Sequence, residues 1–344
     1  MDKSKTCFKT IGIVFISALL FIFPKEISES TILSIKNCVN IIIPSMFAFM
    51  VISSYIISSG IYRYIFAPLY LILKHFIKLD KCLFSIFILS LIGGYPVGIK
   101  LIKEIISQNK SYSEIAEVLS TFCYCISPTF AITMIGLGLF NNPETGLIIY
   151  ISNVTACIII AIFQSNRYNL KIEKAELNAH GGIINSINSS ADVLFKICSI
   201  IVIFNIIITA FESFFNLFQI EIPIILKSLT EISNVVNIKN PNISLLPYLS
   251  AISSTGGACV LFQTYSLIGD DFSKSFFLIS KLPCAVLSFF ITKIILFFWD
   301  ISLPVITETN NYIFELNSNR LILVLLLIMC VILLQKNEKN FKKG

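Results

Sequence analysis

Charged residues are scarce in this chain, and their scarcity identifies the solvent that surrounds it. Of 344 residues only 13% are charged, whereas 56% are hydrophobic and the mean hydropathy is +0.84. A soluble domain carries roughly 25% charged residues, so a large water-exposed surface is excluded. Apolar windows of about 20 residues, the length that crosses a hydrocarbon core, recur along the sequence. The composition therefore predicts a polytopic membrane protein.

Sequence motifs that carry chemistry are also scarce. The chain has two histidines, and its ten cysteines are scattered without a CxxC pair, whereas a zinc site needs four grouped nitrogen or sulfur ligands. We therefore expect no metal and no cofactor, with Cys123 and Cys125 acting as small hydrophobic residues. The sequence contains no GxSxG, HExxH or Walker motif, so we do not expect an enzyme.

The formal net charge of +6 is spread over loops and both ends of the chain. Lysines flank the first and last apolar segments, namely Lys3, Lys5, Lys9, Lys336, Lys339, Lys342 and Lys343. By the positive-inside rule, these lysines place both termini in the cytoplasm. The cations form no stripe with interleaved aromatic residues, so we expect no nucleic-acid partner.

Ten apolar segments predict an all-α transmembrane bundle. They lie at about residues 10–23, 35–59, 62–78, 82–107, 112–140, 144–166, 183–216, 243–268, 272–299 and 318–335. An even number of crossings agrees with two cytoplasmic ends. One basic loop would then lie outside, with Lys74, His75, Lys78 and Lys81. This disagreement indicates that a neighbouring segment is a re-entrant hairpin or lies in the membrane interface. We expect this segment to be 35–59, because Pro44 divides it into two pieces of half-helix length.

Glycine and proline interrupt two of these segments where a continuous helix would be expected. The first break contains Gly93, Gly94, Tyr95, Pro96 and Gly98, and the second contains Ser253, Ser254, Thr255, Gly256 and Gly257. Proline removes a backbone donor, and glycine frees the backbone. Hydrocarbon cannot satisfy the released peptide groups, so such breaks are buried in protein or line a wet cavity, as in transporter binding sites.

A polar linker at 167–182 divides the chain into halves with a similar order of features. We therefore predict an N-terminal span and loop at 1–34, related halves at 35–166 and 183–299, and an external loop, a last span and a basic cytoplasmic tail at 300–344. Paired discontinuous segments at matching positions of two halves indicate a transport site. The alternative is that the glycines only ease helix packing.

Polar side chains near the breaks are candidate solute-binding residues. Lys100 and Gln263 each lie six residues after the second glycine of a pair, and an ionisable group in a membrane segment is a functional candidate. Lys100 could instead extend to the membrane interface, and Gln263 could pair with a neighbouring helix. The hydroxyls of the second break could coordinate an ion or a sugar-like hydroxyl, or bond back within their own helix.

The short segment 222–238 adds two further candidates. Glu231 and Asn234 lie three residues apart and so share one helical face. If the segment is re-entrant, both point at the same cavity. If it lies on the surface, both are solvated.

Four short motifs occur together in these segments, namely Pro44-Ser45-Met46-Phe47, the run from Gly94 to Lys100, Ser127-Pro128, and Gly256-Gly257 with Gln263. This pattern resembles the nucleoside-recognition, or Gate, domain membrane proteins, and among them the YlbJ-type sporulation integral membrane proteins. The resemblance covers about residues 35–299 and implies an endospore-forming bacterium and a multi-pass location in the mother-cell or forespore membrane. It also implies a role in forming the spore cortex and adds Pro44, Ser45 and Ser127 to the candidate site.

These observations predict an all-α polytopic transmembrane bundle of about ten segments with two related halves and discontinuous helices. We expect a transporter of a small polar solute, in which freed peptide groups replace solvent, Tyr95 stacks or hydrogen-bonds, and Lys100 or Gln263 confers selectivity. The alternative is a non-transporting scaffold for spore-envelope assembly. The expected partners are the solute, the lipid bilayer, and a second copy or other spore-envelope membrane proteins. A membrane enzyme would need convergent acidic residues, which the sequence does not indicate.

Overall fold

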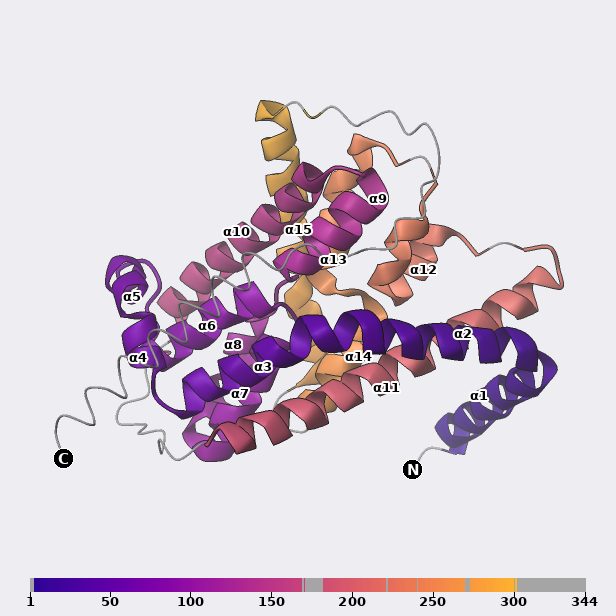
Figure 1. Ribbon diagram of the computed structural model, residues 1–344, viewed down its shortest axis with the longest axis horizontal. Coiled ribbons are helices and arrows are strands. Elements are labelled where there is room, and N and C mark those ends of the chain that lie inside the picture. The colour runs from indigo at the N-terminus through magenta and orange to yellow at the C-terminus, as the bar shows by residue number, and fades with distance from the viewer. Residues whose placement is uncertain are drawn as a thin grey trace. The chain divides into compact units, whose positions relative to one another are not determined.

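The computed structural model describes residues 3–168, 170, 182–220, 222–239, 241–269, 273–299 and 301, and every regular element among them is a helix (Figure 1). The first ten, where η marks a 3-10 or π helix, are α1 (Lys3–Ile22), α2 (Pro24–Asn37), η1 (Cys38–Ile42), α3 (Ile43–Ser58), α4 (Tyr62–Ile65), α5 (Ala67–Leu73), α6 (Lys81–Gly93), α7 (Val97–Gln108), η2 (Lys110–Tyr112) and α8 (Ser113–Phe122). The others are η3 (Phe130–Leu137), α9 (Gly138–Phe140), α10 (Pro143–Arg167), α11 (Ile183–Asn216), α12 (Ile224–Thr230), η4 (Ile232–Asn237), η5 (Ile243–Leu245), α13 (Leu246–Thr255), α14 (Gly257–Ile268) and α15 (Lys274–Phe298).

Five helical segments within the described residues are long and apolar enough to cross a membrane, judged by length and composition. They are Pro24–Ser58, Pro143–Arg167, Ile183–Asn216, Ile243–Ile268 and Lys274–Phe298. Large apolar side chains on these segments are exposed, including Phe195 and Phe297. Apolar surface of this kind suits contact with lipid and would drive association in water. The predicted all-helical class is confirmed, and a multi-pass membrane location is supported.

The ten predicted segments are matched only in part. The segment 62–78 contains α4 and α5, which have four and seven residues and are too short to cross a membrane. The segments 82–107 and 112–140 are each divided into shorter helices. The segment 318–335, most of the linker 167–182 and most of the stretch 300–344 lie outside the described residues. The ten-segment count and the relation between two halves therefore stay predictions.

The segment 35–59 differs from its predicted form, because Pro44 does not divide it into a hairpin. The elements α2, η1 and α3 follow one another as one helix, which lies alongside α11 (Figure 1). A proline in a helix clashes with the carbonyl four residues earlier, here that of Asn40. The π turn of η1, in which Ile43 N donates to Cys38 O, widens the helix at this carbonyl. A re-entrant hairpin at 35–59 therefore does not account for the basic loop at 74–81.

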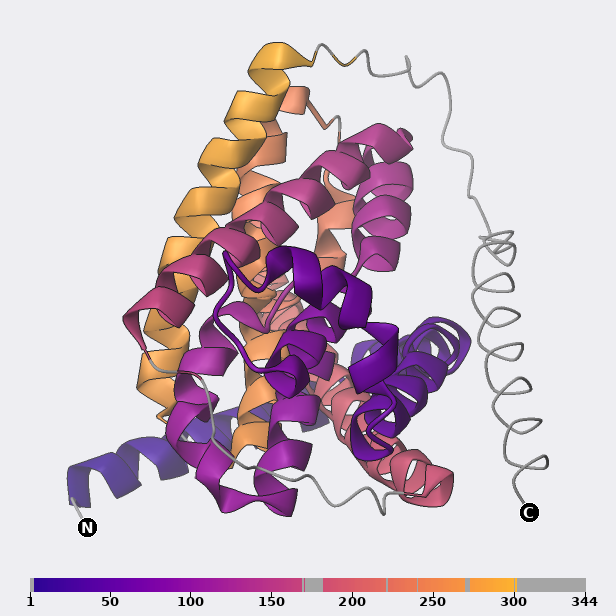
Figure 2. The same cartoon turned by 90° about the vertical axis from the view of Figure 1, so that its left-hand side faces the viewer.

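The buried core lies where short helices meet long ones. The helices α10, α13 and α15 contact one another (Figure 2). The helix α8 contacts both α10 and α15. The helix α7 contacts α6, α8 and α14. Among the largest fully buried side chains are aromatic residues and two lysines, Lys100 and Lys281. Because a buried cation is costly unless it is paired, these lysines mark places where polar groups must converge.

Candidate functional site

The first predicted break separates α6 from α7. The chain turns at Gly94, which has a φ of 74°, and the peptide bond between Tyr95 and Pro96 is cis. A Cβ on Gly94 would lie 2.6 Å from Ser127 Cβ, and one on Gly98 would collide with the carbonyl oxygen of Cys123. Glycine is therefore needed at Gly94 for its backbone conformation and at both positions for close approach.

A third interruption, after α8, packs against the first break. The chain leaves the helix at Phe122 and stays non-helical through Ser127. Tyr95 N donates to the carbonyl oxygen of Cys125 at 2.7 Å. The rings of Tyr95 and Tyr124 stack with centroids 4.9 Å apart and an interplanar angle of 26°. The candidate Ser127 therefore lies beside Gly94, although the sequence marks this interruption only by Pro128.

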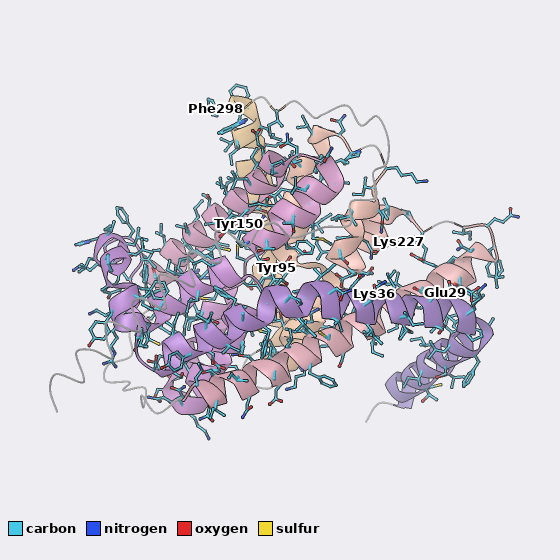
Figure 3. The ribbon with its side chains drawn as sticks, in the orientation of Figure 1. Glu29, Lys36, Tyr95, Tyr150, Lys227 and Phe298 are labelled. Carbon is cyan, nitrogen blue, oxygen red and sulfur yellow. The ribbon has the colours of Figure 1, made fainter. Side chains whose placement is uncertain are left out.

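The second break separates α13 from α14 at Gly256 and Gly257, both with positive φ. The last carbonyl groups of a helix have no partner within it. Tyr124 Oη donates to Thr255 O at 2.8 Å, and Tyr95 Oη donates to Ser253 O at 3.2 Å. Tyr95 points inward among the helices, whereas Phe298 projects from the end of α15 (Figure 3). The two breaks therefore meet, although the bonded residues are 131 and 158 positions apart in the chain.

The predicted hydroxyl candidates of the second break divide into two kinds. Ser254 Oγ and Thr255 Oγ1 donate to carbonyl oxygens of their own helix. Ser253 Oγ is buried and makes no hydrogen bond within the described part of the chain. Gln263 is 4% exposed, and its Nε2 donates to Cys259 Sγ one turn earlier on α14. Ser253 Oγ is therefore a free polar group at this break.

Glu231 is buried beside the second break, with 6% of its surface exposed. Its Oε1 accepts from Ser233 N and Oγ, at 3.3 and 3.1 Å, whereas its Oε2 has no hydrogen-bond partner among the described residues. Burial raises the pKa of the Glu231 carboxyl. The carboxylate interacts electrostatically with Tyr95 and Cys259, which lie at the first break and on α14. The solvated alternative thus does not apply to Glu231.

The neighbouring residues fix this carboxylate next to the break. A Cβ on Gly257 would lie 3.1 Å from the carbonyl oxygen of Leu229, so the junction between α12 and η4 packs directly on α14. Asn234, the other candidate of this segment, is half-buried, and its Nδ2 donates to Lys227 O at 3.4 Å. Asn234 therefore stabilises the turn that carries Glu231.

Lys100 is held by a carboxylate that the sequence reasoning did not single out. Its Nζ lies 2.7 Å from Glu104 Oε1, and the lysine is 1% exposed. Glu104 also accepts hydrogen bonds from Ser54 and Ser189, at 2.9 and 2.6 Å. This cluster joins α7 to α3 and α11, so the charge of Lys100 is directed at Glu104. The four-residue spacing of the pair could have indicated it.

Lys281, on α15, is a buried cation that the sequence reasoning missed. Its Nζ donates to Ser120 O at 2.7 Å and lies 4.3 and 4.2 Å from the ring centroids of Tyr124 and Phe277. Ser120 belongs to the last turn of α8, where free carbonyls and the helix dipole attract a cation, and aromatic faces do so too. A lysine inside an apolar helix of 25 residues was the available signal.

The candidates Pro44 and Ser45 begin α3. Ser45 Oγ donates to Ile42 O, within the same continuous helix. Farther along α3, Phe49 lies against Gly93, where an added Cβ would be 2.7 Å from Phe49 Cδ1. The helix α3 therefore reaches the first break through Phe49.

The fold and site define a helical, multi-pass membrane protein in which interrupted helices meet in the interior. The chain is similar to the sporulation integral membrane protein YlbJ of Bacillus subtilis (strain 168), with 21% identity over 149 residues. These residues are 43% of this chain, and they span about a third (36%) of that curated relative. No family model and no solved structure matches the chain. The similarity supports a distant YlbJ-like relationship and leaves membership of the Gate domain family a prediction.

Proposed function

We propose that the protein is a transporter or permease that moves a small polar solute through the region where the two breaks meet. The observation that supports this proposal is the pair of hydrogen bonds from Tyr95 and Tyr124 to the carbonyl oxygens of Ser253 and Thr255. Discontinuous helices that meet inside a membrane protein are the usual setting of a transport site. In the described arrangement the tyrosines occupy the freed carbonyls and hold the breaks together.

A solute would enter by exchanging its own hydrogen bonds for those of the tyrosines. A typical intramolecular hydrogen bond has a net value of only about 0.5–1.5 kcal/mol, so the exchange is energetically accessible. The groups that would face the solute are acceptors or small hydroxyls, namely the freed carbonyls, Glu231 Oε2 and Ser253 Oγ. A solute rich in hydrogen-bond donors, either hydroxylated or cationic, suits this lining better than an anion.

The biological setting is also part of this proposal. Because the relative is named as a sporulation integral membrane protein, we propose that this chain acts in a mother-cell or forespore membrane and is needed for cortex formation. A Gate-like domain, with the candidate residues of both breaks as its binding site, completes the proposal. The second candidate function is a scaffold without transport, which is favoured by the satisfied carbonyls of the second break.

Purified protein in liposomes separates the two functions. Vesicles are loaded with a mixture of hydroxylated and cationic metabolites, and the compounds that leave are measured by mass spectrometry. We expect at least one compound to leave faster than from protein-free vesicles, and Glu231→Gln to reduce that rate at least tenfold. The matched control is Glu114→Gln, because Glu114 is exposed on α8 and should leave the rate unchanged. Equal rates with and without protein for every compound would contradict transport and favour the scaffold.

A further inference from the structure

An apolar cavity of about 220 Å³ opens between α6, α10 and the turn that follows α5. All the described residues around it are apolar, and they include Leu73, Phe76, Ile77, Phe87, Leu91 and Ile162. For comparison, an apolar cavity of about 150 Å³ stays dry and takes up benzene. A soluble ligand needs a few polar groups to orient it, and these walls supply none. The cavity therefore suits a hydrocarbon chain.

The turn that forms one wall is also the basic loop whose charge disagreed with the predicted topology. Lys74, His75 and Lys78 lie between or next to the wall residues of this turn, and all three are exposed. Lys78 N donates to Ser165 Oγ at 3.2 Å, which attaches the turn to the end of α10. Arg167, exposed two residues farther along α10, lies at this end too. Cations and an apolar cavity are therefore neighbours.

The acidic residue of this stretch does not remove the positive character of the loop. Asp80 precedes α6, and its Oδ1 accepts from Leu83 N at 2.8 Å as the N-cap of that helix. Clusters of lysine and arginine at the end of a membrane helix attract anionic headgroups, and basic pockets between such helices bind anionic lipids. The helix α10 is one of the segments long enough to cross a membrane.

We propose that this cavity and the adjacent basic turn form a binding site for an anionic phospholipid, with part of one acyl chain in the cavity and the phosphate beside Lys74, Lys78 and Arg167. The site accounts for the basic loop at 74–81, which the predicted re-entrant hairpin at 35–59 does not explain. It is separate from the meeting point of the breaks and does not depend on a transport function.

The chain of 344 residues, purified in a neutral detergent, tests the proposal by native mass spectrometry. Phosphatidylglycerol and phosphatidylcholine are added in equal amounts, and the lipid retained on the protein is measured. We expect phosphatidylglycerol to be retained at least fivefold more, and the double variant Lys74→Gln and Lys78→Gln to lose most of this preference. The matched control is Lys25→Gln with Lys36→Gln, two exposed lysines of α2.

Two further arms separate the acyl chain from the headgroup. Ile162→Trp or Ile88→Trp fills the cavity and should lower retention of phosphatidylglycerol severalfold with all the lysines present. Inorganic phosphate at millimolar concentration should not displace the lipid. Equal retention of both lipids, an undiminished preference in the lysine variant, or displacement by phosphate alone would each overturn the proposal. The proposal would also be overturned if Ile162→Trp or Ile88→Trp folded and retained as much phosphatidylglycerol as wild type.

Discussion

Replacing Gly98 by alanine tests how closely the first break packs on the segment after α8. Gly98 lies in α7 with an ordinary helical backbone, so alanine is not strained there by its φ. The new Cβ would collide with the carbonyl oxygen of Cys123 and would lie 2.6 Å from Ser90 Cβ. Cys123 cannot easily retreat, because its own N–H donates to Leu119 O and the neighbouring Cys125 O is held by Tyr95 N. The substitution therefore tests overpacking without adding backbone strain.

The expected loss follows from two opposing effects. Overpacking costs about 1–3 kcal/mol, and the upper end applies where backbone blocks the added atom. Alanine gains about 1 kcal/mol over glycine in a helix, so the net loss of stability is about 2 kcal/mol. At Gly93 the added Cβ would meet the ring of Phe49, which can rotate, so a smaller loss is expected. At Gly12 no described atom lies within 4 Å, so alanine should be neutral or stabilising.

The assay is thermal: protein in detergent is heated, and the fraction that stays monodisperse is measured by fluorescence-detected size-exclusion chromatography. Because heat inactivation of a membrane protein is a rate, the prediction is an order of stability. Gly98→Ala should be the least stable, then Gly93→Ala, then wild type, with Gly12→Ala at or above wild type. If Gly98→Ala loses its monodisperse state at the same temperature as wild type, then the two segments do not approach each other as closely as described.

Two further substitutions test the polar contacts that join the breaks, with the same assay. Tyr124→Phe leaves the carbonyl oxygen of Thr255 without its donor, a loss of about 1–3 kcal/mol that should place this variant below wild type in the order of stability. Tyr64→Phe, at an exposed position, should be as stable as wild type. A loss shared equally by both tyrosine variants would show that the hydroxyl contact is unimportant. Lys281→Met removes the charged donor from the end of α8 and should cost about 1–3 kcal/mol. Lys293→Met, exposed on the same helix, should have little effect, and an equal loss there would refute a special role for Lys281.

The membrane class and the positions of the breaks could be predicted because both depend on local properties. Hydrophobic composition decides which solvent a segment tolerates, and the helical class follows because hydrocarbon satisfies no backbone group. Gly94, Pro96 and Gly256 interrupt helices wherever the helices are placed. A proline is a weaker signal, since Pro44 lies in a continuous helix whose π turn accommodates it.

The partners of the breaks could not be predicted, because they come from segments distant in the chain. The bonds of Tyr124 to Thr255 and of Lys281 to Ser120 bridge 131 and 161 positions. Which side chain reaches a free carbonyl depends on how the helices pack, and no local pattern encodes it. The burial of Glu231 is of the same kind, since its exposure depends on α14 covering the junction between α12 and η4.

The amino-acid sequence alone thus determined that this is a helical membrane protein with glycine-rich interruptions, because residue type decides solvent preference and helix continuity. Only the tertiary structure decided that the interruptions meet, that tyrosine hydroxyls occupy the carbonyls of the second break, and that Lys100 is directed at Glu104. Those contacts are between helix surfaces, and the geometry of packing selects them from many chemically equivalent pairs.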